Sequence, residues 1–130
     1  MYSATTKSIR VTVEPHYVSE RSDPMEPRFF WTYTVEIVNS GAASVQILAR
    51  HWIITDQSGR REDVRGVGVV GEQPVISPGS SFTYTSGCPL PTPSGTMVGT
   101  YQAIDDDGAL FTVAIPAFTL DMPGASRVLN

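Results

Sequence analysis

The sequence has little that could cross-link the chain or carry it through a membrane. Cys88 is the only cysteine among the 130 residues, so neither an intramolecular disulfide nor a cysteine-rich zinc site can form. No apolar run approaches the roughly 20 residues of a membrane span, and residues 1–10 hold no apolar core of signal-peptide length. We therefore expect a cytoplasmic protein without a membrane partner.

Basic charge is also scarce. Lys7 is the only lysine, the formal net charge is -4, and charged residues make up only 17% of the chain. Binding to a nucleic-acid backbone requires clustered Lys and Arg, and the nearest such cluster is formed by Arg60, Arg61 and Arg65. The composition therefore argues against nucleic acid as the main partner.

A sustained helical period is missing, and alternation of apolar and polar residues takes its place. The clearest alternation runs from residue 29 to 37, where the odd-numbered residues form an aromatic and aliphatic stripe that needs a second sheet to cover it. The predicted core combines four residues of this stripe with two from later segments: Trp31, Tyr33, Val35, Ile37, Ile53 and Tyr101.

Several other segments have the pattern of short strands. They span residues 9–13, 45–54, 82–85, 97–104 and 110–115. The segment 45–54 is apolar on both faces, which predicts a central strand. Asp105–Gly108 ends in Asp-Gly, a strong hairpin signal, and Pro116 should limit the pairing of the strand before it. A proline-rich loop is predicted from 87 to 95, and the tail from Pro123 to Asn130 should fray.

About seven short strands with closely spaced turns are typical of a sandwich. The sequence therefore predicts one domain over residues 1–130, with an ordered core from about 7 to 122. The expected fold is all-β: a two-sheet antiparallel β-sandwich, immunoglobulin-like or fibronectin type III-like. A barrel is the alternative.

Three glycines, Gly66, Gly68 and Gly71, spell the G-x-G-x-x-G motif, which in a βαβ unit presents N–H groups to a pyrophosphate. Here Pro74 follows too closely for a helix to begin, so no helix dipole can face an anion. The sequence therefore predicts that the glycines serve backbone geometry in a bulged strand or loop. A weaker role stays open, in which a backbone nest and Arg65 hold a small anion.

Other reactive residues form no recognisable catalytic or metal site. The acidic run Asp105–Asp107 lacks the ligand spacing of a calcium loop and is typical of a solvated turn. His16 and His51 lie on separate predicted strands, and Cys88 has neither a base nor an orienting group evident beside it. The sequence thus predicts no enzyme, no metal site and no cofactor.

The order of glycines and prolines resembles the ApaG family over roughly residues 9–122. The residues that carry this resemblance include Gly66 to Gly71, Gln73-Pro74, Pro78-Gly79, Tyr84 to Gly87, Thr92-Pro93, Gly95 to Met97, Ile115-Pro116 and Phe118. The resemblance implies a fibronectin type III-like sandwich in a small bacterial cytoplasmic protein. It also implies a link to diadenosine tetraphosphate hydrolysis by genetic context and to cobalt and magnesium handling by phenotype. Similar eukaryotic domains look like protein-interaction modules, and the family supplies no catalytic residues.

Two functions are therefore expected. The first is a non-enzymatic protein-interaction module with an unknown protein partner, present as a monomer or homodimer, with the link to divalent cations that the resemblance implies. The alternative is a small-anion or nucleotide-binding protein that uses Arg65, Gly66, Gly68 and Gly71, where binding of phosphate would be weak. A metal-responsive role of the histidines or the acidic turn ranks below both.

Overall fold

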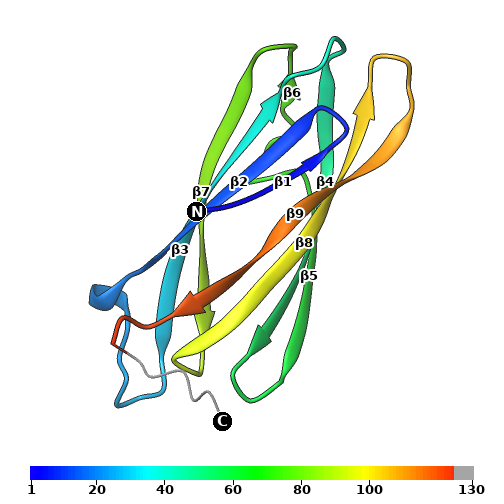
Figure 1. Cartoon of the computed structure of the whole chain (residues 1–130). Coiled ribbons are helices and arrows are strands. Elements are labelled where there is room, and N and C mark those ends of the chain that lie inside the picture. The colour runs from blue at the N-terminus through cyan, green and yellow to red at the C-terminus, as the bar shows by residue number, and fades with distance from the viewer. Residues whose placement is uncertain (125–130) are drawn as a thin grey trace.

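The chain folds into strands joined by turns, with one short 3-10 helix, over residues 1–124, the part that the computed structural model describes (Figure 1). The elements in chain order are β1 (Tyr2–Thr6), β2 (Ile9–Tyr17), η1 (Ser19–Arg21), β3 (Phe29–Asn39), β4 (Val45–Asp56), β5 (Arg61–Val67), β6 (Val75–Ile76), β7 (Ser81–Leu90), β8 (Ser94–Asp105) and β9 (Leu110–Asp121). β1 was not predicted and lies before residue 7, where we expected the ordered core to begin. The predicted tail begins with a turn at Pro123-Gly124, and its remainder, 125–130, lies outside the described residues.

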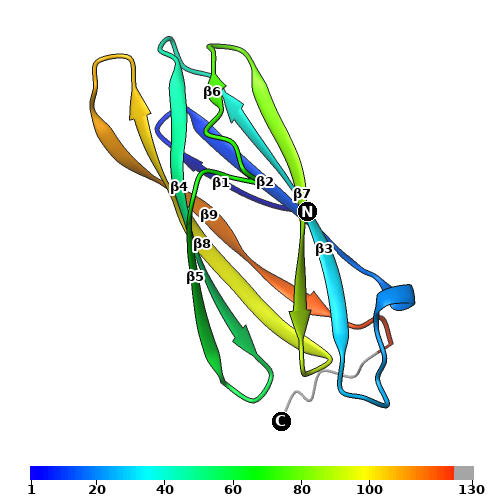
Figure 2. The ribbon, with the colours of Figure 1, turned by 180° about the vertical axis from the view of Figure 1, so that it is seen from behind.

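The strands form two antiparallel sheets that pack face to face, as the two opposite views show (Figures 1 and 2). One sheet has the order β1-β2-β3-β7. The other has the order β5-β4-β8-β9, and β6 pairs with the beginning of β4. The predicted fold class, an all-β sandwich of two antiparallel sheets, is thus confirmed. Its finer assignment as immunoglobulin-like or fibronectin type III-like stays a prediction.

The core lies between the sheets because alternate residues of each strand point inward. The predicted core residues that are buried are Trp31, Tyr33, Val35, Ile37 and Tyr101. The prediction for Ile53 was wrong, since this residue is only half-buried while its neighbours Trp52 and Ile54 are buried. The register against β8 shifts at Leu48, and this bulge exchanges the two faces of β4 for every residue after it.

Pro116 interrupts the pairing of the last described strand, as expected, but the strand does not end at residue 115 as predicted. β9 continues to Asp121, because its register against β8 shifts between Met97 and Gly99 and leaves Pro116 in a bulge. A bulge residue needs no ladder hydrogen bond, so the missing N–H of proline is tolerated there. The predicted loop 87–95 was also too long, since β7 runs to the residue before Pro91 and β8 begins at the residue after Pro93.

One side of the sandwich, the closed seam, joins β1 of the first sheet to β9 of the second. The hydroxyl oxygens of Tyr2 and Thr119 are 2.9 Å apart, and the N–H of Ala114 donates to the hydroxyl of Thr6 over 3.0 Å. The ring centroids of Tyr2 and Phe118 are 5.9 Å apart. Hydrogen bonds and an aromatic contact therefore link the two sheets along this side.

The opposite side, the open seam, lies between β7 of the first sheet and β5 of the second. A hollow of about 360 Å³ is lined there by residues of β4, β5 and β7, among them Ile54, Glu62 and Leu90. No hydrogen bond joins β5 to β7 in the part of the chain that the structure describes. The two sheets are therefore left apart on this side.

Candidate functional site

The polar groups best placed to bind a ligand lie on β4 and β5. They surround an open pocket of about 460 Å³, whose lining residues are Ala49, Arg50, His51, Arg65, Gly66, Val67, Thr100 and Gln102. Two of the predicted anion-site residues, Arg65 and Gly66, thus line one pocket. Sequence reasoning considered His51 for a metal-responsive role and did not place Arg50 or His51 beside Arg65. The turn signal after β4 could have placed His51 opposite Arg65 in a hairpin.

Three basic side chains beside this pocket lie around a single carboxylate, that of Asp63. It accepts hydrogen bonds from Arg61 Nε and a terminal guanidinium nitrogen at 2.7 and 3.0 Å. The Nε2 atom of His51 lies 2.9 Å from Asp63, and a guanidinium nitrogen of Arg65 lies 3.9 Å away. Arg61 first, and His51 second, hold the pKa of Asp63 well below its usual range. Two guanidinium groups around one charged carboxylate leave the cluster positive at neutral pH.

Arg50 reaches along the glycine-rich segment from β4. One of its terminal nitrogens donates to the carbonyl oxygens of Val67 at 3.2 Å and Gly68 at 3.0 Å. A Cβ atom on Gly66 would lie 2.6 Å from the guanidinium carbon of Arg50. Gly66 is therefore explained by this close approach.

Arg50 also influences three buried tyrosines. The hydroxyls of Tyr84 and Tyr101 are hydrogen-bonded to each other, and the hydroxyl of Tyr33 bonds to Ser86. Burial raises the pKa of each tyrosine above its ordinary value, and the charge of Arg50 only partly opposes this effect. The three hydroxyls therefore stay protonated at neutral pH and act as a buried hydrogen-bonding group.

Gly68 and Gly71 serve a tight turn. Gly68 has φ +64, and its N–H donates to a β4 carbonyl oxygen 2.7 Å away. Val69 and Glu72 exchange two backbone hydrogen bonds around Val70 and Gly71, whose φ angles are +43 and +81. Positive φ at both central residues is what a type I′ turn requires. The N–H groups of Gly68 and Val69 are thus used within the backbone, and the anion role stays a prediction.

Three valines on the segment around this turn are exposed. Their exposed fractions are 74% for Val67, 51% for Val70 and 62% for Val75. Val67 also lines the pocket beside Arg65. Apolar surface and positive charge therefore adjoin at this end of β5.

The remaining candidate residues lie apart from one another. Cys88 is buried, and burial first and Glu62 second raise the pKa of its thiol to about 12. His16 lies on β2, in the other sheet from His51. Asp105 caps its hairpin turn by accepting two backbone N–H groups. Within residues 1–124, no group of three or more His, Cys, Asp or Glu side chains could hold a metal ion.

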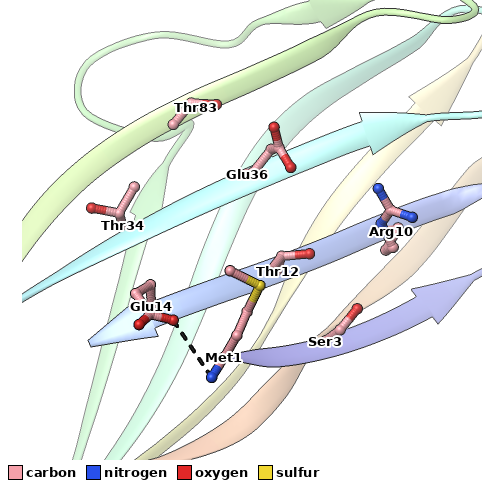
Figure 3. Close-up of a pocket in the computed structure, with 8 residues that line it drawn as sticks. All are labelled: Met1, Ser3, Arg10, Thr12, Glu14, Thr34, Glu36 and Thr83. Carbon is pink, nitrogen blue, oxygen red and sulfur yellow. Dashed lines mark ion pairs between the residues drawn. The ribbon is translucent and has the colours of Figure 1, made fainter. Parts of the chain in front are cut away.

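A second open pocket of about 460 Å³ lies on the outer face of the four-stranded sheet (Figure 3). Its charged residues are Arg10, Glu14 and Glu36, and the amino group of Met1 lies 3.5 Å from Glu14. Figure 3 shows these side chains spread over several strands, without convergence on one point. This face therefore offers a broad polar surface and no focused site.

The fold and the pocket define a small β-sandwich that presents basic and apolar side chains beside β5, the edge strand of the five-stranded sheet. The chain belongs to the ApaG domain family, whose model matches residues 19–105. It is 57% identical to Protein ApaG of Paramagnetospirillum magneticum over 130 residues, which is all of both chains. It is 55% identical to Protein ApaG of Azorhizobium caulinodans over the same length. The predicted family resemblance is thus confirmed.

Solved structures show the same fold. The ApaA protein from Bordetella pertussis matches with a TM-score of 0.88 and 51% identity, over 90% of this chain and 95% of that one. The C-terminal domain of wzt matches with a TM-score of 0.54 and 8% identity, over 99% of this chain and 81% of that one, which is a likeness of fold alone. No helix within residues 1–124 has the length and apolar character needed to cross a membrane.

Proposed function

We propose that the protein is a non-enzymatic binding module that contacts a protein partner through the binding surface formed by His51, Arg65, Val67 and Val70. The observation that supports this function is the exposed Val67, which lines a positively charged pocket, with the exposed Val70 in the turn that follows β5. Apolar side chains supply the area that association buries, and charges orient the partner. The partner segment that fits this surface carries a carboxylate beside an apolar side chain.

The charge of the binding surface favours an acidic segment even though the whole chain is negative. Asp63 is bound bidentately by Arg61, whereas Arg65 lies 3.9 Å from it and 71% of its side chain is exposed. Arg65 is therefore free to pair with a carboxylate of the partner. Local positive potential on a chain of net charge -4 directs acidic groups to this surface.

Affinity purification with two disruptive variants tests this function. Arg65→Glu reverses the charge of the binding surface, and Val70→Asp removes apolar area at a position whose positive φ aspartate tolerates. Proteins recovered with the wild type should fall at least about tenfold with either variant, a change of about 1.4 kcal/mol. The matched control is Arg10→Glu, the same charge change on the other sheet, which should recover them normally. Equal recovery with all four proteins would contradict the function.

A small-anion or nucleotide-binding function is the second candidate. It is supported by the side chains of Arg50, His51 and Arg65 around one pocket, with Gly66 between them. Binding should be weak, roughly millimolar or about -4 kcal/mol, because no helix N-terminus within residues 1–124 faces the pocket. It should weaken further as salt rises, since exposed charges are screened.

Calorimetry separates the two candidates. Pyrophosphate, ATP and diadenosine tetraphosphate are titrated into the wild type and into Arg65→Glu. Micromolar affinity that is lost in the variant would favour nucleotide binding over a protein partner. For the link to cobalt or magnesium we propose no ion site on this chain, since no group of three or more His, Cys, Asp or Glu side chains within residues 1–124 could hold a metal ion.

A further inference from the structure

β7 is an edge strand whose outer hydrogen-bonding groups are unpaired. It pairs with β3 on one side only. The N–H of Asn39 donates to the carbonyl of Ser80, and bonded pairs alternate along an antiparallel ladder, so the even-numbered residues of β7 face β3. The residues whose N–H and C=O groups point away from the sheet are therefore Ser81, Thr83, Thr85 and Gly87. These groups make no hydrogen bond within residues 1–124.

β7 carries less protection than other edges of this sandwich, since its one shielding residue, Pro89, lies next to its end. β7 is 10 residues long and contains no charged residue. On β5 the outward side chains of Arg61, Asp63 and Arg65 are charged, and β1 has only 5 residues and lies against β9. Charges and short length are the usual protection against strand addition. The fourth edge, β9, is also long and nearly uncharged, but it contains Pro116 in a bulge and lies against β1 at the closed seam. β7 therefore presents the longest uncharged stretch that no other strand covers.

The side chains of β5 that face the open seam determine which side chains of an added strand would be complementary to it. β5 turns Val64 and Glu62 toward the seam, because these residues alternate with its outward charged residues. Val64 is half-buried and packs against the core, and Glu62 is exposed. Glu62 raises the pKa of Cys88 on β7, which places its charge across the seam.

The hollow at the seam is lined by apolar residues such as Ile54 and Leu90, and also by charged ones. Of the charged residues, Asp56 accepts N–H groups of its own turn with Arg60 beside it, and Arg61 is bound to Asp63. Within residues 1–124, Glu62 is the lining carboxylate that makes no ion pair.

We infer that β7 accepts an extended segment of a partner protein as an additional strand of the four-stranded sheet. The segment carries apolar residues at the alternate positions that face the seam, with one Lys or Arg beside Glu62. This surface differs from the one around Arg65, so the inference does not rest on the proposed function.

A second copy of the chain fits the open seam less well than such a segment. The inward side chains of its β7 include Tyr84, Cys88 and Leu90, which are already buried in their own core. They could not also cover Val64 or pair with Glu62. Strand addition by a separate extended chain supplies free side chains for both.

Amide hydrogen exchange with a synthetic peptide tests strand addition. The probe is acetyl-Val-Thr-Lys-Thr-Val-Thr-Val-amide, which alternates seam-facing and outward residues. In the free protein the N–H groups of Thr83, Thr85 and Gly87 should exchange fast, while those of Tyr84 and Ser86 are protected by β3. The peptide should slow exchange at the first three positions about tenfold or more.

Two matched substitutions separate backbone pairing from side-chain contact. Thr83→Pro removes an outward N–H at a position where an edge strand tolerates proline, and it should weaken peptide binding at least tenfold. Thr83→Val keeps the N–H and should change binding less than about twofold. Glu62→Lys should weaken binding of the Lys peptide about fivefold and strengthen that of the peptide with Glu in its place. If Thr83→Pro does not fold, a peptide whose backbone N–H groups facing β7 are N-methylated provides the same test, because it cannot donate these hydrogen bonds.

Three results would overturn the inference. One is the absence of any added protection at millimolar peptide. Another is unchanged binding by Thr83→Pro together with unchanged binding of the N-methylated peptide. The third is protection of Thr83 and Thr85 in the free protein that disappears on dilution, which would show that a second copy occupies β7.

Discussion

At each of the two seams an edge strand of one sheet lies opposite an edge strand of the other, and the seams differ in the contacts between those strands. Where β1 meets β9, the hydroxyl of Tyr2 is hydrogen-bonded to that of Thr119, the hydroxyl of Thr6 accepts from the N–H of Ala114, and the rings of Tyr2 and Phe118 are in contact. Where β7 faces β5, a hollow of about 360 Å³ and a free strand edge remain. The comparison teaches that this small domain concentrates stabilising contacts on one side and leaves groups able to bind on the other.

Truncation of one aromatic residue at the closed seam should have the largest effect. Phe118 is 1% exposed, and its ring centroid lies 5.9 Å from that of Trp52. Phe118→Ala should lower the free energy of unfolding by about 3–5 kcal/mol, and Val64→Ala at the open seam by about 1 kcal/mol. Urea unfolding of both variants measures the difference. Equal losses would show that the two seams contribute alike.

Substitution in the segment that connects β5 to β7 should have the next largest effect. A Cβ atom on Gly68 would lie 2.0 Å from the carbonyl oxygen of Glu72, at φ +64. Gly71 has φ +81 with nothing within 4 Å. We expect Gly68→Ala to cost roughly 3 kcal/mol and Gly71→Ala roughly 1 kcal/mol, because only the first adds a steric clash. Thermal unfolding that ranks them in the opposite order would contradict this structure of the turn.

The charged edge of the open seam should make stability depend on acid. The folded pKa of Asp63 is below its unfolded value of about 3.9, so its contribution is present above that pH. This contribution should be lost as pH falls below about 4 toward the folded pKa. The urea midpoint of Asp63→Asn should therefore be lower than that of the wild type at pH 7, and the two midpoints should converge in acid. Arg61→Gln should cause the same loss, and the two changes should not add.

The smallest effect is expected for the reactivity of Cys88, which reports whether solvent reaches the core through the open seam. Cys88 faces it but is 2% exposed, and burial raises its pKa to about 12. Because the thiolate is the reactive form, iodoacetamide should leave native Cys88 unmodified at pH 8 and modify it in urea. Mass spectrometry measures the modification. Fast reaction in the native protein would mean that the seam opens as far as the core.

Much of the fold can be predicted from the local alternation of apolar and polar residues. The errors in the predicted core and strand ends arise at bulges, where one strand has an extra residue relative to the strand it pairs with. The stripe from Trp31 to Ile37 is buried as predicted because β3 has no bulge. Ile53 was misplaced because the bulge at Leu48 is set by pairing with β8, which local sequence does not reveal. The predicted strand end at residue 115 was wrong for the same reason, since the bulge that holds Pro116 lets β9 continue.

The candidate site was only half predictable for a related reason. Arg65 directly precedes Gly66, the first glycine of the G-x-G-x-x-G motif, so both residues could be assigned to one candidate site from the sequence. His51 and Arg50 belong to β4, and only the register of the β4–β5 hairpin brings them to the same pocket. The side of Gly66 on which Arg50 lies depends again on the bulge at Leu48.

The closed seam also bears on how the protein is made. The hydrogen bond between Tyr2 and Thr119 spans 117 residues of sequence. During synthesis on the ribosome, β1 must wait for β9, while β2 and β3 can already pair as a hairpin. Contacts between distant residues slow folding into the range of milliseconds to seconds, because a long loop must close first. Until then the side chains of β1 that contact β9 stay uncovered, and during this time the nascent chain most needs protection from aggregation.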